Sequence, residues 1–84
     1  MRVTLRRNVR RQPSPAALRF RRAVAGRVRE LATKRKLPLV KMADFAGISR
    51  GHMGRILAAE AAVTLDTLVY LSEALKVSVK DLLP

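Results

Sequence analysis

Cysteine is absent from the 84-residue chain, and histidine, acidic residues and aromatic residues are scarce. Without cysteine the chain can form neither a disulfide nor a thiolate metal site. One histidine and six scattered acids provide no cluster for a metal or a catalytic triad. We therefore expect no enzyme activity, no metal and no cofactor. Three aromatic residues are also too few for the stacking platform that single-stranded nucleic acids use.

A long apolar segment is also missing. Spanning a bilayer takes about 20 apolar residues, and no run in the sequence approaches that length. The arginine-rich N-terminus lacks the apolar region of a secretory signal. We expect one cytoplasmic domain, large enough to form a modest core without a metal or a disulfide.

Positive charge is abundant, and its excess is confined to one end of the chain. The formal net charge is +12; residues 1–36 contain thirteen Lys and Arg with one acid, whereas residues 37–84 contain five of each sign. A basic block beside a neutral folded unit favours a polyanionic partner, because each neutralised phosphate releases counterions. Duplex DNA is the favoured partner, while RNA and an anionic surface remain open.

The first part of the chain predicts a basic arm followed by a helix. Residues 1–13 are rich in arginine and poor in apolar residues, which indicates a flexible arm. Ser14 and Pro15 have the form of an N-cap and a first helical residue. We expect this helix to end near residue 36, before Leu37 and Pro38 interrupt it. Its expected core-facing stripe consists of Phe20, Val24, Val28 and Leu31.

Residues 39–58 contain two short apolar-faced segments joined at Gly47. Pro38 is expected to open the first segment, and Gly47 stands where a left-handed residue would end it. We expect Ile48 to be the buried residue of the turn and Ser49 to cap the second segment. The expected buried residues are Met42, Ala43, Ala46, Met53 and Ile56. This layout predicts a helix-turn-helix, whose second helix can enter a DNA major groove.

The C-terminal part predicts two further helical elements. Thr64 is expected to cap a helix. Its expected apolar stripe consists of Leu65, Leu68, Leu71 and Leu75. Ser78 followed by Asp81 has the form of a capping box, which predicts one last helical turn. The fold class is therefore all-α, with five helices and no sheet.

These segments together resemble the Xre/Cro and lambda-repressor type helix-turn-helix family. The matching segments are RVREL (27–31), MADFAGIS (42–49), MGRI (53–56), TLDTLVYLSEALKVSV (64–79) and DLL (81–83). The resemblance extends over residues 28–83 and implies a compact five-helix, repressor-like domain that binds operator DNA, usually as a symmetric dimer. We expect the whole domain to span residues 14–84. Three positions depart from the family: Leu39 replaces a usual glutamine, Leu57 a frequent glutamate, and Ala59 a glycine.

A DNA-binding role can be assigned to particular residues. On a third helix of this type we expect contacts to base edges in the first turn and contacts to phosphates around them. The expected base-reading residues are Arg50, Gly51 and His52. The expected phosphate-binding residues are Ser49, Gly54, Arg55, Lys41, Arg22 and Arg29. The arm residues Arg2, Arg6, Arg7, Arg10 and Arg11 are expected to hold phosphates or to follow a minor groove.

The favoured hypothesis is a sequence-specific, nucleoid-associated transcriptional regulator, acting as a repressor. It would form a homodimer through apolar surface on the fourth and fifth helices. One alternative is an architectural DNA binder in which the arm dominates. Another is an antitoxin or adaptor that binds a protein partner through Leu39, Leu57 and the C-terminal apolar face.

Overall fold

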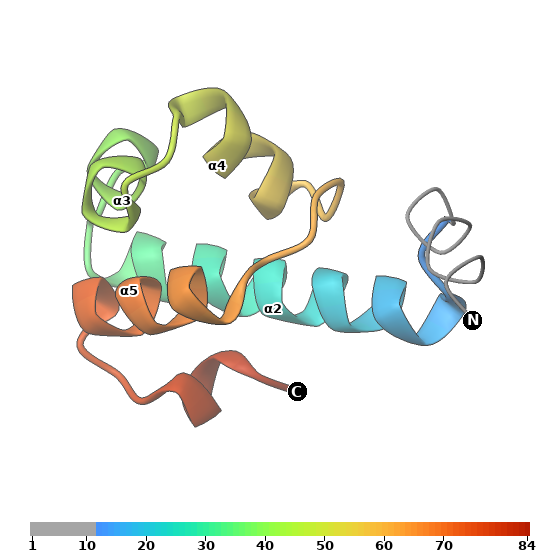
Figure 1. Cartoon of the computed structure of the whole chain (residues 1–84). Coiled ribbons are helices and arrows are strands. Elements are labelled where there is room, and N and C mark those ends of the chain that lie inside the picture. Colours follow the sequence, from blue (N-terminus) through green and yellow to red (C-terminus); the bar gives the residue numbers. More distant parts are fainter. Residues whose placement is uncertain (1–11) are drawn as a thin grey trace.

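The computed structural model describes residues 12–84, and within that range the chain forms four α-helices, one 3-10 helix and no strand (Figure 1). The elements are α2 (Pro15–Lys34), α3 (Leu39–Ala46), α4 (Arg50–Leu57), α5 (Leu65–Leu75) and η1 (Val79–Leu82). The all-helical prediction is confirmed. The fifth predicted helix is a 3-10 turn rather than an α-helix. The five arginines expected on the arm lie outside the described residues.

Helix α2 begins as the sequence predicts and ends two residues earlier. The Ser14 hydroxyl accepts a hydrogen bond of 3.1 Å from the Ala17 backbone, with proline at the first helical position. The helix ends at Lys34 because Lys36 is left-handed, with φ of 54°. The expected end near residue 36 is confirmed to within two residues, since a left-handed residue cannot continue the helix.

The four α-helices within residues 12–84 all end in the same way. Each is followed by a residue in the left-handed conformation, namely Lys36, Gly47, Ala59 and Lys76, with φ between 54° and 70°. The amide of the next residue then turns back to a carbonyl five residues earlier. These bonds are Leu37 to Ala32, Ile48 to Ala43, Glu60 to Arg55 and Val77 to Ser72, at 2.8 to 3.0 Å. This is the Schellman arrangement, which satisfies carbonyls that a helix end leaves unpaired.

The turn between α3 and α4 confirms the predicted helix-turn-helix. Gly47 is left-handed, with φ of 70° and ψ of 31°, and α3 packs against α4. The Ser49 hydroxyl accepts a hydrogen bond of 3.0 Å from the His52 backbone and so caps α4. Ile48 is half-buried and packs at the edge of the core. It contacts the core as the sequence predicts, but it is only half-buried because the turn itself lies at the surface.

The core lies where α2, α3, α4 and α5 meet, and η1 closes it from the C-terminal side. Val28, Met53, Leu71, Leu75 and Leu82 are fully buried at its centre. Two predicted core residues are exposed instead: Phe20 is 55% exposed and Leu65 79% exposed. Both lie near the N-terminal end of their helices, and no element covers them.

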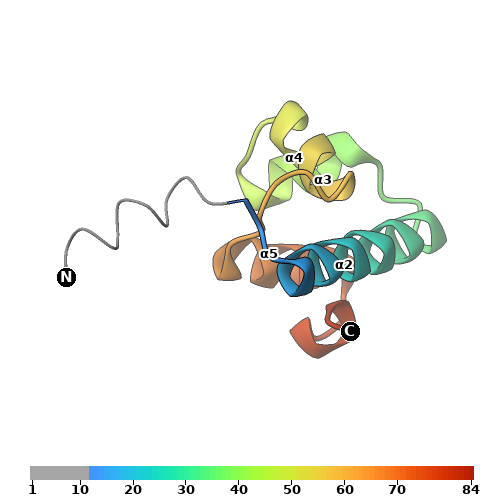
Figure 2. The same ribbon diagram turned by 90° about the vertical axis from the view of Figure 1, so that its right-hand side faces the viewer.

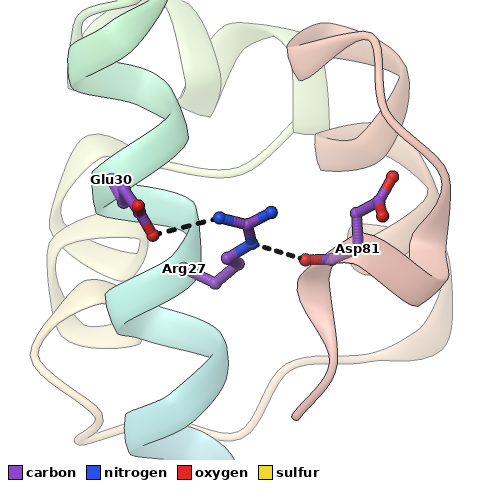
Figure 3. A network of polar contacts seen from close by, with 3 residues as sticks. All are labelled: Arg27, Glu30 and Asp81. Carbon is purple, nitrogen blue, oxygen red and sulfur yellow. Dashed lines mark hydrogen bonds and ion pairs between the residues drawn. The ribbon is translucent and has the colours of Figure 1, made fainter.

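η1 is joined to α2 by polar contacts (Figure 3). The Arg27 Nε donates to the Asp81 carbonyl at 2.8 Å, and Arg27 also pairs with Glu30 at 3.1 Å. The Asp81 carboxylate accepts from the backbone and the hydroxyl of Ser78, as in the predicted capping box. The Ser78 hydrogen bonds lower the pKa of Asp81 below its ordinary value, because they stabilise the charged form.

Replacing Ala59 with glycine is expected to stabilise the fold. A left-handed residue with a side chain costs about 1–2 kcal/mol, and the greater freedom of glycine in the unfolded chain returns about 0.4–1 kcal/mol. Ala59→Gly should therefore raise the free energy of unfolding by roughly 0.5–1 kcal/mol, measured by urea denaturation. The adjacent Ala58 has φ of −89°, so Ala58→Gly should destabilise. A loss of stability in Ala59→Gly contradicts the left-handed assignment.

Candidate nucleic-acid interface

Helix α4 has one buried face and one open face. Met53 and Ile56 are fully buried against the core, with at most 2% exposure. Arg50, Gly51 and Arg55 are exposed. The helical repeat of 3.6 residues places Gly51 nearly opposite the buried pair. The other two predicted contact residues on α4, His52 and Gly54, are half-buried at the sides of the helix.

The two glycines of α4 are not required by packing within the protein. A Cβ atom at Gly51 or at Gly54 would meet no atom within 4 Å. Their φ values are negative, so the backbone does not require glycine either. Each glycine still costs a helix about 1 kcal/mol relative to alanine. The result is a low strip of backbone between Arg50 and Arg55, exposed at Gly51 and half-buried at Gly54, which lets another molecule approach α4 closely.

Arg29 connects α2 to the end of α4. Its guanidinium donates a hydrogen bond to the backbone carbonyl of Leu57, 28 residues further along the chain. The C-terminal end of α4 carries the negative end of the helix dipole, which stabilises a cation at this position. The sequence predicts a phosphate contact for Arg29, and it does not reveal this structural role because the two residues are remote in sequence. Arg29 therefore helps to hold α4 in place on α2.

The other predicted phosphate-binding residues lie in different places. Ser49 caps α4 at its start, and its hydroxyl hydrogen stays available to donate. Lys41 is exposed in the first turn of α3. Arg22 lines a hollow with Phe20 and Pro84, near the C-terminus. The structure thus brings Arg29 to α4 and places Arg22 beside the chain end.

Leu39 and Leu57 are half-buried against the core. Both line an open groove of about 510 Å³, with Arg29 and Lys36 also on its wall. Because the core already covers much of both side chains, they offer a protein partner less apolar surface than the sequence suggests. The groove therefore gives little support to the adaptor hypothesis, which relies on Leu39 and Leu57 as partner contacts.

Cations dominate the surface of the described region. Within residues 12–84, Arg27 with Glu30 is the one ion pair closer than 4 Å. The same residues contain no group of three or more His, Asp or Glu side chains close enough to hold a metal. No helix among them is long and apolar enough to cross a membrane. Apart from the Arg27–Glu30 pair, the basic side chains of α2 and α4 have no acidic partner within 4 Å in the described region.

No protein-family model and no curated protein matches the chain. Solved structures do match. The restriction-modification controller protein C.AhdI from Aeromonas hydrophila is 26% identical, with a TM-score of 0.69 over 74% of this chain and 94% of its own. An HTH_3 family transcriptional regulator from Vibrio cholerae is also 26% identical, with a TM-score of 0.71 over 79% of this chain and 37% of its own.

The fold is that of helix-turn-helix regulators. The clp gene regulator ClgR from Corynebacterium glutamicum shares it at 22% identity, with a TM-score of 0.71 over 74% of this chain. The predicted helix-turn-helix regulator fold is thus confirmed. This chain spans 66% of the length of ClgR and 37% of the Vibrio cholerae protein.

Removing the Arg29 guanidinium is expected to loosen α4 and lower stability. Arg29→Met keeps most of the aliphatic stem but leaves the Leu57 carbonyl without its donor. The free energy of unfolding should fall by roughly 0.5–1.5 kcal/mol, measured by urea denaturation. Arg22→Met, on the same helix, is the matched control and should change it by less than about 0.5 kcal/mol. Equal losses in the two variants would show that the Arg29 contact contributes nothing particular.

Proposed function

We propose that this chain is a sequence-specific, double-stranded DNA-binding transcriptional regulator that places α4 in the major groove. The observation that carries this proposal is the open face of α4. Two arginines flank two glycines that the fold itself does not need. The solved structures that share the fold are described as regulators, which supports the same function.

In this proposal the first turn of α4 reads the bases. The Arg50 guanidinium can pair bidentately with guanine O6 and N7. Gly51 leaves its backbone close to the base edges, and His52 contacts the same groove from the side. Specificity then depends on Arg50 and on how closely α4 approaches the groove floor.

Phosphate contacts would fix the orientation of α4 and supply much of the affinity. Ser49, Gly54, Arg55 and Lys41 are the proposed phosphate contacts around the groove. Arg29 is proposed to bind a phosphate too, with the donors that the Leu57 carbonyl leaves free, whereas Arg22, which lines the hollow beside Pro84, is not included. The arginines of the N-terminal arm would release further counterions on binding. They are Arg2, Arg6, Arg7, Arg10 and Arg11.

A homodimer is part of the proposal, because a two-fold dimer doubles the bases read at a palindromic site. Exposed apolar residues on α5 support such an interface. These are Leu65, Val69 and Tyr70, each at least 40% exposed. A dimer bound across a promoter would repress by excluding the polymerase, and it would act in the cytoplasm on the nucleoid.

An architectural DNA binder is the second candidate, favoured by the confinement of the +12 charge to residues 1–36. In that case the arm would supply most of the affinity and α4 would read little sequence. Deletion of residues 1–13 distinguishes the architectural binder from the sequence-specific regulator. A specific regulator should lose affinity but keep its preferred site, whereas an architectural binder should lose binding altogether.

Selection of bound duplexes from a random pool is expected to return a palindromic consensus. Arg50→Ala should weaken binding to that consensus by about 10- to 100-fold while leaving binding to unrelated duplexes nearly unchanged, since one bidentate base contact is worth about 1–3 kcal/mol. Lys80→Ala, which removes an exposed cation from η1, controls for the lost charge. Equal affinity of the unmodified protein for all duplexes would overturn the proposal.

Adding a methyl group to the open face of α4 is expected to change stability and DNA binding in opposite directions. Gly51→Ala should raise the free energy of unfolding by about 0.5–1 kcal/mol, yet weaken specific binding about tenfold by holding the helix away from the bases. Gly26→Ala in α2 is the matched control, because its Cβ would meet only the tip of Arg29, at 3.9 Å. It should stabilise without affecting binding. Unchanged DNA affinity in Gly51→Ala would show that α4 does not approach DNA closely.

A further inference from the structure

An exposed aromatic residue stands on the side of α2 that faces the C-terminus. Phe20 is 55% exposed, although it belongs to a helix whose next turn is buried at Val24. Leu83, 40% exposed, and Pro84 lie close to it. Large exposed apolar residues that gather in one place mark an interaction surface more often than scattered ones do.

The surface around Phe20 is concave. Phe20 forms part of the walls of two adjoining hollows, of about 440 and 140 Å³. The larger hollow lies between α2 and Pro84, and the smaller one is formed with Val63, Leu68 and Leu83. Hollows of this kind can accept protruding apolar side chains, which a flat lipid surface does not present.

Three arginines line these hollows: Arg19, Arg21 and Arg22. Among residues 12–84 no acidic side chain lines either hollow, and none pairs with these arginines. The surface is therefore apolar at its centre and positive at its rim. We call Phe20, Leu83 and Pro84, with these three arginines, the Phe20 face.

A second copy of this chain is a poor occupant of the Phe20 face. A two-fold contact would bring the face onto itself and set three arginines against three. DNA fits poorly as well, because phosphates match the arginines but leave Phe20 and Leu83 uncovered. A protein segment with apolar side chains surrounded by carboxylates complements both the centre and the rim.

We propose that the Phe20 face docks an acidic amphipathic helix of a partner protein. Apolar side chains of that helix enter the two hollows beside Phe20, and its carboxylates pair with Arg19, Arg21 and Arg22. Binding of this kind depends on the apolar anchor for affinity and on the charges for orientation and association rate.

The Phe20 face lies across α2 from α4. α2 contacts both α4 and η1, and Figures 1 and 2 both show α4 on one side of α2 and η1 with the C-terminus on the other. A partner on the Phe20 face would leave the open face of α4 accessible. The inference does not require that α4 binds DNA, because docking is measured on the free chain.

The test uses the full chain and a labelled synthetic helix of about four turns, with leucines along one side and glutamates beside them. Fluorescence anisotropy should show binding that weakens as salt rises. Phe20→Ser should weaken it about tenfold, since roughly half of the phenylalanine surface is available to the peptide. Phe45→Ser is the matched control, because Phe45 on α3 is 54% exposed and lies away from the hollows. It should change the affinity by less than about twofold.

Other outcomes overturn the proposal. Binding that is equal in the Phe20→Ser and Phe45→Ser proteins would show that only net charge attracts the peptide. Stronger binding of a peptide with lysine in place of glutamate would contradict the role of the arginines. Phe20-dependent self-association, measured by light scattering, or Phe20-dependent binding to anionic lipid vesicles without peptide binding would assign the face to another occupant.

Discussion

The left-handed residue that ends each α-helix is the constraint on which the rest of this fold depends. α3 and α4 have eight residues each, too few to be stable alone in water. Each is closed by an amide that turns back to the helix, from Ile48 after α3 and from Glu60 after α4. Ile48 also packs at the core, as Leu37 does after α2 and Val77 after α5. Only one of the four left-handed residues is glycine, so packing must compensate for strain at the other three.

α2 is the platform that fixes the two outer elements. Arg29 donates to the Leu57 carbonyl at the end of α4, and Arg27, two residues away, donates to the Asp81 carbonyl in η1. A step of two residues on a helix turns the side chain by about 200°, so the two arginines reach opposite sides. Part of the arginine content is therefore engaged in contacts within the fold.

The same geometry separates the open face of α4 from the Phe20 face. The outer face of α4 is low and positive because Gly51 and Gly54 expose backbone between arginines. The Phe20 face is hollow, apolar and positive. Since α2 stands between them, the proposed DNA contact and the proposed protein contact would not compete.

Local signals in the sequence determined where the helices begin and what the turn at residue 47 does. The caps at Ser14, Ser49 and Thr64 and the left-handed Gly47 follow from hydrogen bonds within a few residues, so the residues themselves specify them. Only the tertiary structure decided that Arg29 supports α4 and that Phe20 stays exposed. Helical periodicity tells which residues share a face, but whether a face is covered depends on elements far away in the sequence.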